Sequence, residues 1–215
     1  MLEPLHQLHD MGCTAYVAGG AVRDTVLGRP VKDIDIFIWH FNHDPSRGLS
    51  QSQQKSWQGL RPGDDAESWL TWVFDNPTWE PQANHAEQYH GGSFIADEAY
   101  NISPHIEDVV NLRLRNIEYQ FITTTIHPLE YVNQYFDINL CRGWCDGTKM
   151  SLGTAFMQDW HNKTITVSGD LTRAQYQYTI YQHLPRVVAK YPDYTVVIDP
   201  ELTAKYPQAS GKFTR

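Results

Sequence analysis

The sequence predicts an α/β fold in which a small mixed β-sheet is flanked by helices and carries a long insertion. Strand-like and helix-like segments alternate at both ends of the chain, and a polar stretch at residues 40–110 separates them. The chain has 215 residues, a length that fits one domain. We therefore expect a single domain over residues 1–203 and a loosely ordered tail over residues 204–215.

The composition narrows the class of protein further. The chain is 41% hydrophobic, which is enough for a core, and its net charge of −8 argues against a surface that binds polyanions over its whole area. No apolar run approaches the ~18 residues of a membrane span, so we expect no membrane partner. The 3 cysteines leave an odd thiol and favour a reduced, cytoplasmic setting.

The first forty residues predict four short elements in alternation. Leucines at helical spacing, an apolar segment that runs into two glycines, and an alternating acidic and apolar segment are the signals. The elements are a helix through Leu2, Leu5 and Leu8 that ends at Gly12, a strand at 16–18, a helix at 21–27 and a strand at 33–39.

The insertion reads as loop with one short helix at 69–74, and regular elements return after it. The alternation of Phe136, Ile138 and Leu140 with polar residues predicts a strand. The C-terminal elements are strands at 117–122, 136–141 and 165–167, helices at 128–135 and 171–190, and a helix kink at Pro185.

The most informative stretch joins a glycine turn to a pair of acids. Gly19 and Gly20 open the predicted helix, where glycine allows the backbone to approach a phosphate closely. Asp33 and Asp35 follow on a strand, and their i, i+2 spacing places both carboxylates on one face, where they could hold a divalent metal. A backbone site for phosphate next to two metal-binding carboxylates is what a nucleotidyl transfer reaction requires.

Two-metal phosphoryl chemistry calls for a third carboxylate from a neighbouring strand. Asp137 and Glu118 both fit the strand alternation. We favour Asp137, because an acid between Phe136 and Ile138 would be costly to bury without a metal or a base. Its alternative role is an ion pair with Arg142, and the alternative for Glu118 is a solvated strand position.

Basic residues near the motif could neutralise a triphosphate. Arg23 and Lys32 are the candidates, although Arg23 could equally pair with Asp24 or Asp33. Further along, Arg173, Arg186 and Lys190 of the last predicted helix could reach a phosphate or an RNA end.

The stretch Gly19-Gly20-Ala21-Val22-Arg23-Asp24, then Leu27-Gly28-Arg29, then Lys32-Asp33-Ile34-Asp35, resembles the head-domain signature of tRNA CCA-adding enzymes and bacterial poly(A) polymerases. These enzymes belong to the DNA polymerase β-like nucleotidyltransferase superfamily. The resemblance covers residues 13–39 and thins beyond them. Where the family carries Arg-Arg-Asp-Phe, this chain has Tyr135-Phe136-Asp137, without the two arginines.

The resemblance implies transfer of a nucleoside monophosphate from an NTP to an acceptor hydroxyl, with Mg²⁺ or Mn²⁺ as cofactor. Asp33, Asp35 and Asp137 would hold the metal, with Glu118 as the other candidate, and Gly19, Gly20, Arg23 and Lys32 would hold the triphosphate. An RNA 3′ end, above all tRNA, is the expected acceptor, and a protein or small-molecule hydroxyl is the alternative. The short chain is more like a minimal, phage-type member, which would act in the host cytoplasm. An inactive nucleotide- or partner-binding module is the non-enzymatic alternative.

Three other features have simpler readings. Cys141 and Cys145 could suggest zinc, but buried free thiols are the stronger interpretation. His40 and His43 could suggest a metal site, but a position in a loop is favoured for both. The tryptophans could stack bases, but core packing is favoured; they are Trp57, Trp69, Trp72 and Trp79.

Overall fold

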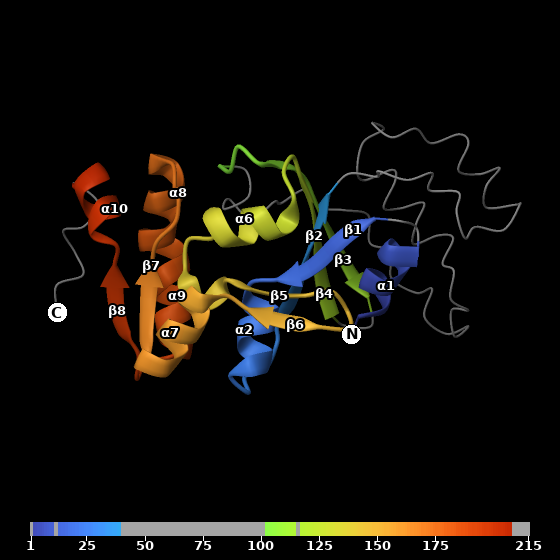
Figure 1. The fold of residues 1–215 in the computed structure, drawn as a ribbon, viewed down its shortest axis with the longest axis horizontal. Helices are drawn as coiled ribbons and strands as arrows, with labels where there is room; N and C mark the ends of the chain where they lie inside the picture. Colours follow the sequence, from blue (N-terminus) through green and yellow to red (C-terminus); the bar gives the residue numbers. More distant parts are fainter. Residues whose placement is uncertain (1, 11–12, 40–101, 115–116, 208–215) are drawn as a thin grey trace, which may run out of the picture.

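The computed structural model describes residues 2–10, 13–39, 102–114 and 117–207. The predicted loop and helix of the insertion, the histidine pair and the four tryptophans lie outside these residues. A six-stranded mixed sheet, whose strands lie between residues 14 and 152, forms one half of the molecule, and a smaller unit of helices around two strands forms the other, C-terminal half (Figure 1).

The large sheet has the strand order β3-β4-β2-β1-β5-β6. Only β2 and β4 run parallel; the other neighbours are antiparallel. The strands are β1 (Thr14–Ala18), β2 (Asp33–Trp39), β3 (Ile106–Leu114), β4 (Ile117–Thr124), β5 (Gly143–Cys145) and β6 (Met150–Leu152). The predicted mixed sheet flanked by helices is confirmed, and β3 shows that the end of the presumed insertion supplies an edge strand.

Each face of this sheet has its own apolar core. Ile34, Ile36 and Ile38 are buried on the face covered by α1 (Glu3–Asp10) and α2 (Gly20–Val26). Phe37 and Ile122 are buried on the other face, beneath α6 (Pro128–Gln134). The alternation of β2 therefore places Asp33 and Asp35 on the α6 side, where the sheet extends beyond the helix.

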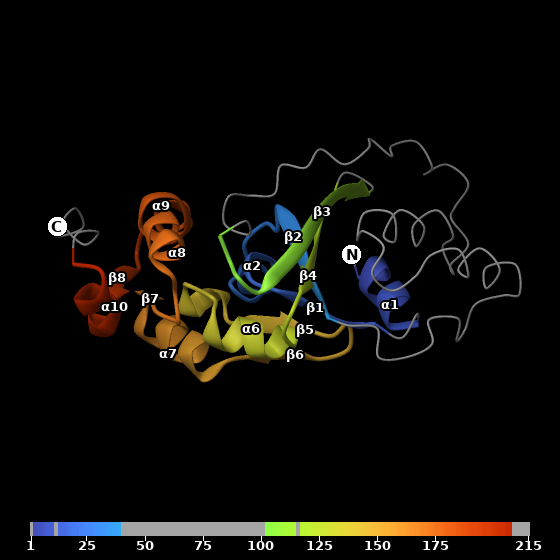
Figure 2. The same ribbon diagram turned by 90° about the horizontal axis from the view of Figure 1, so that it is seen from above.

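A third core holds the C-terminal half together. A parallel pair, β7 (Thr164–Val167) and β8 (Thr195–Ile198), is linked through a long helical segment, and α10 (Pro200–Lys205) packs beside it (Figures 1 and 2). Apolar side chains at helical spacing along this segment are buried there: Tyr176, Ile180, Leu184 and Val187. The remaining helix of this half is α7 (Thr154–Asn162).

The long helix is interrupted where Pro185 predicted a kink. It consists of α8 (Arg173–Tyr178), a π-helical turn η2 (Thr179–His183) and α9 (Leu184–Lys190). Proline has no N–H to give to the preceding turn, so a wider turn can be accommodated there without losing a bond. The π turn redirects His183, which the site below uses.

One prediction about local structure is wrong. Residues 136–141 do not form a strand: Ile138 makes a single bridge to Val167, and the chain then tightens into a 3-10 turn, η1 (Asn139–Cys141). At the C-terminus, α10 continues to Lys205 and Tyr206 donates a hydrogen bond to the Leu171 carbonyl at 2.9 Å, and residues 208–215 of the predicted tail lie outside the described residues.

Candidate active site

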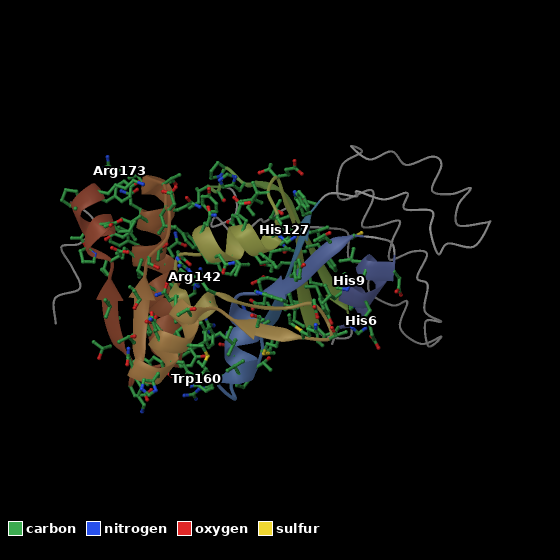
Figure 3. The ribbon with its side chains drawn as sticks, viewed as in Figure 1. His6, His9, His127, Arg142, Trp160 and Arg173 are labelled. Atoms are coloured by element: carbon green, nitrogen blue, oxygen red, sulfur yellow. The ribbon has the colours of Figure 1, made fainter. Side chains whose placement is uncertain are left out.

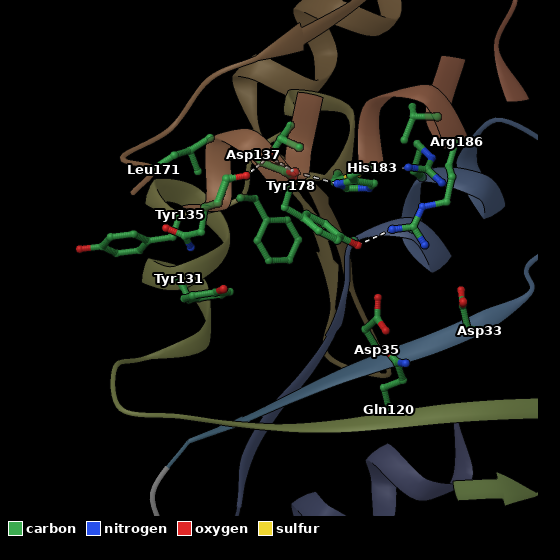
Figure 4. A pocket seen from close by; sticks show the side chains of 18 of the residues that line it. Asp33, Asp35, Gln120, Tyr131, Tyr135, Asp137, Leu171, Tyr178, His183 and Arg186 are labelled. Carbon is green, nitrogen blue, oxygen red and sulfur yellow. Dashed lines mark hydrogen bonds and ion pairs between the residues drawn. The ribbon is translucent and has the colours of Figure 1, made fainter. Parts of the chain in front are cut away.

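A cavity of about 250 Å³ lies where the large sheet meets the helical segment α8–η2–α9 (Figure 4). Its floor comes from β2, β4 and the glycine turn, and its walls come from α6 and the C-terminal helices. All predicted site residues except Glu118 line it: Gly19, Gly20, Arg23, Lys32, Asp33, Asp35 and Asp137.

The two strand acids point into this cavity from β2 (Figure 4). Asp35 lies opposite Gln120 of the parallel neighbour β4, and Asp33 lies opposite Glu118. The Asp33 side chain is 38% exposed and has the Lys32 ammonium 3.9 Å away. Two carboxylates on one open strand face offer the oxygen ligands that Mg²⁺ prefers.

The glycine turn runs beside these acids. Gly19 has φ +78°, a conformation that side-chain-bearing residues rarely adopt, and its N–H donates to the Gly143 carbonyl at 3.3 Å. A Cβ at Gly19 would lie 3.5 Å from a carboxylate oxygen of Asp35 and 3.4 Å from the Phe136 ring. The absence of a side chain here therefore keeps the backbone open to the cavity next to the acids.

Arg23 has the structural role that the sequence left open. Its side chain is buried, its Nε donates to Asp24 at 2.7 Å, and its Nη1 contacts the sulfur of Cys141 at 3.1 Å. Asp24 also accepts hydrogen bonds from Lys190 at 2.6 Å and from the Tyr191 hydroxyl at 2.8 Å. Burial alone would raise the pKa of Asp24, but these partners lower it below its usual value. This cluster joins α2 to α9 under the cavity.

Among the described residues that line the cavity, Lys32 and Arg186 are exposed cations, and Lys190 is exposed with its ammonium bonded to Asp24. Arg186 donates a hydrogen bond to the Tyr178 hydroxyl, which brings the guanidinium from α9 toward Asp33 and Asp35 (Figure 4). Arg173 does not take part, because it lies at the opposite end of α8 and does not line the cavity (Figure 3).

Asp137 lies on the wall opposite the strand acids, and not on a strand. Its Oδ2 accepts hydrogen bonds from His183 Nδ1 at 2.7 Å and from Thr179 at 2.8 Å. Burial opposes charge on both partners, but their attraction lowers the pKa of Asp137 and raises the pKa of His183 to about 10. Arg142, the partner considered from the sequence, instead donates to the Phe136 carbonyl at 2.8 Å (Figure 3).

Glu118 is exposed and lies outside the cavity, although it faces the same side of the sheet as Asp33. Gln120, two residues further along β4 and on the same face of the sheet, does line the cavity. The alternation of β4 brings Gln120 to this strand face, but an amide lacks the charge by which a third metal ligand is predicted from a sequence. His183 was missed as well, because a π turn cannot be read from a helical pattern.

An aromatic wall completes the cavity on the α6 side. Tyr131 and Tyr135 stack with their ring centroids 5.9 Å apart, and His105 lies 4.3 Å from the Tyr135 ring. Tyr131 is buried and donates a hydrogen bond to Ser103, whereas Tyr135 is half-exposed. A half-exposed ring in such a wall is a surface on which a nucleic-acid base can stack.

The cysteines of the chain carry free thiols. Cys141 is buried at the cavity wall, as predicted for a free thiol, whereas Cys145, which was also expected to be buried, is partly exposed. In the described part of the chain, no group of three or more His, Cys, Asp or Glu side chains is arranged to hold a metal. None of the helices described there combines the length and apolar composition of a bilayer crossing.

Comparison with known proteins agrees with this geometry. Residues 15–80 match the family model described as the poly A polymerase head domain. A CCA-adding enzyme of Bacillus pumilus is 62% identical over 32 residues, which are 15% of this chain and 8% of that enzyme.

Solved structures extend the likeness of the fold to nearly the whole chain. The Bacillus stearothermophilus CCA-adding enzyme in complex with CTP has a TM-score of 0.51 at 16% identity and covers 94% of this chain. The Thermotoga maritima CCA-adding enzyme complexed with tRNA has a TM-score of 0.52 at 13% identity and covers 97% of this chain. In both comparisons the chain spans 41% of the other protein's length, and at these identities the likeness establishes the fold.

The glycine and aspartate motif, the sheet that carries it and the matched head-domain model agree with one another. Residues 15–80 are similar to the head domain of poly A polymerases, and the fold of the chain is similar to that of CCA-adding enzymes.

Proposed function

We propose that the chain transfers a nucleoside monophosphate from an NTP to an acceptor hydroxyl in a metal-dependent reaction. The observation that carries this proposal is the meeting of Asp33, Asp35 and the open Gly19–Gly20 backbone in one cavity. Asp33 and Asp35 would hold Mg²⁺ or Mn²⁺, and their oxygen ligands suit either ion. The bound ion would neutralise phosphate charge and lower the pKa of the attacking hydroxyl.

The chain's own groups would orient the donor. Gly19 and Gly20 let the triphosphate approach the backbone beside Asp35. Lys32 and Arg186 offer positive charge around it, whereas Arg23 and Lys190 are both bonded to Asp24. The acceptor oxygen forms a bond to the α-phosphorus, the bond to the β-phosphate oxygen breaks, pyrophosphate leaves, and the hydroxyl proton is released to water.

We further propose an RNA 3′ end, with tRNA first, as the acceptor. The aromatic wall supports this choice, because Tyr135 could stack a terminal base within reach of the cavity. One structurally similar enzyme is recorded in complex with tRNA, which makes tRNA the first substrate to try.

Incubation with each of the four α-labelled NTPs, total tRNA and a single-stranded RNA would test the proposal. Labelled RNA and free pyrophosphate are expected with the unaltered chain and Mg²⁺ or Mn²⁺. Asp33→Ala and Asp35→Ala should abolish both products, and Asp193→Ala, on the exposed Lys163–Asp193 pair, serves as the control. Transfer that survives both strand variants would contradict the mechanism.

A further inference from the structure

The strand position that faces Asp35 across the sheet carries an amide instead of an acid. Gln120 of β4 is in register with Asp35 of β2, and both line the cavity. Figure 4 shows the two side chains next to each other and on the same side of the sheet as Asp33. Among the described residues of β4, this position is the one from which a neighbouring strand reaches the acid pair.

Of the acids in the described residues, neither Glu118 nor Asp137 is placed to act in its stead. Glu118 is exposed and outside the cavity. Asp137 accepts bonds from His183 and Thr179 through the same oxygen, on the opposite wall. Consistent with this, no set of three or more acidic, His or Cys side chains within the described ranges is arranged as a metal site.

The replacement of an acid by an amide changes what such a site can hold. A carboxylate carries a full charge and can bridge two cations, whereas an amide oxygen is neutral and offers one weak ligand. Two divalent ions bring four positive charges, and Asp33 and Asp35 supply only two negative ones. An ion that binds the triphosphate tail gains much of the phosphate charge, whereas a second ion would depend more on the charge of the protein's own ligands.

We propose that the metal centre is a two-carboxylate site, Asp33 and Asp35, in which Gln120 occupies the position of a third ligand. The chain then holds one divalent ion tightly, together with the nucleotide, and a second ion only weakly. This inference rests on the proposed function and adds to it: nucleotide binding should be strong, and the transfer step should depend on high concentrations of free metal.

Mn²⁺ binding measured by electron paramagnetic resonance tests the inference without reference to turnover. The full chain is titrated with Mn²⁺ in the presence of an ATP analogue that has a methylene group between the α and β phosphorus atoms. We expect one tight Mn²⁺ per chain. The variant Gln120→Glu should tighten binding of a second Mn²⁺ by about tenfold or more, since ligand charge sets affinity.

Three further variants make the result specific. Gln177→Glu adds the same charge at an exposed position of α8 and should leave the number of tight ions at one. Glu118→Gln and Asp137→Asn should also leave it at one. Two tight ions in the unaltered chain, a loss of metal in either of the last two variants, or no gain in Gln120→Glu while circular dichroism shows it folded would overturn the inference.

The design separates this inference from the proposed function. If the analogue and Mn²⁺ bind and Asp33→Ala removes them, the proposed donor site stands, whatever the effect of Gln120→Glu. If neither binds to the unaltered chain, the proposed function and the inference are overturned together.

Discussion

Replacement of Asp24 by asparagine should be among the most damaging single changes in the chain. Asp24 is 2% exposed and accepts bonds from Arg23 at 2.7 Å, Lys190 at 2.6 Å and Tyr191 at 2.8 Å. Asparagine keeps one acceptor oxygen, loses the charge, and turns an NH₂ group toward one of these donors. Arg23, itself only 3% exposed, would then be a buried cation without its carboxylate.

The size of the effect follows from the bonds that are lost. Each hydrogen bond to a charged group is worth about 1.5–3 kcal/mol, and breaking a buried ion pair by removing one partner costs about 3–5 kcal/mol. Since asparagine retains part of the hydrogen bonding, we expect the free energy of unfolding to fall by about 3 kcal/mol. Such a loss would be a large fraction of the stability of a typical domain.

Urea unfolding at pH 7, followed by tryptophan fluorescence, would measure this change as a lower midpoint with an unchanged slope. The matched control is Asp193→Asn, which breaks an ion pair whose Lys163 and Asp193 side chains are 65% and 56% exposed and should cost about 0–1 kcal/mol. If Asp24→Asn destabilises the chain no more than Asp193→Asn does, the cluster does not hold α2 to α9 and the reasoning is refuted.

Two other predictions concern the cavity walls. Gly19→Ala forces a side chain into φ +78° beside Asp35; we expect a loss of about 1–3 kcal/mol in urea unfolding and weaker NTP binding in calorimetry, and an unchanged NTP affinity would argue against the phosphate role. His183 has its pKa raised to about 10 in the folded chain, so its contribution to stability is complete below about pH 6.5 and is lost as the pH rises toward 10. The unfolding free energy should therefore fall over that range in the unaltered chain, and the His183→Gln variant should lack this part of the fall; equal slopes would contradict the ion pair with Asp137.

The donor half of the site could be predicted from the sequence because its signals are local. The β2 strand runs from Asp33 to Trp39 as its alternation predicted, and α2 begins at Gly20. Because residues near each other in sequence determine a strand or a short helix, the two glycines and the i, i+2 acids already define most of the geometry of the donor site.

The acceptor-side wall could not be predicted, because distant parts of the chain decide it. The alternation of Phe136 to Cys141 looks like a strand, but Ile138 finds only one bridge partner in Val167, and the chain must turn toward β5. The partner of Asp137 stands 46 residues away on a π turn. Strand β8 was missed for the same reason, since its four residues acquire a partner only through β7.

The cavity draws its walls from two halves of the chain that are built on separate cores, and Asp24 ties those halves together beneath it. A nucleotide bound in the cavity would contact both halves and so provide a second connection between them. Its binding energy would then be shared by both halves, and amide hydrogen exchange should slow together in β2 and in α9. If the bound nucleotide stabilises the contact between the two halves, that contact should be weakest just after the product has dissociated.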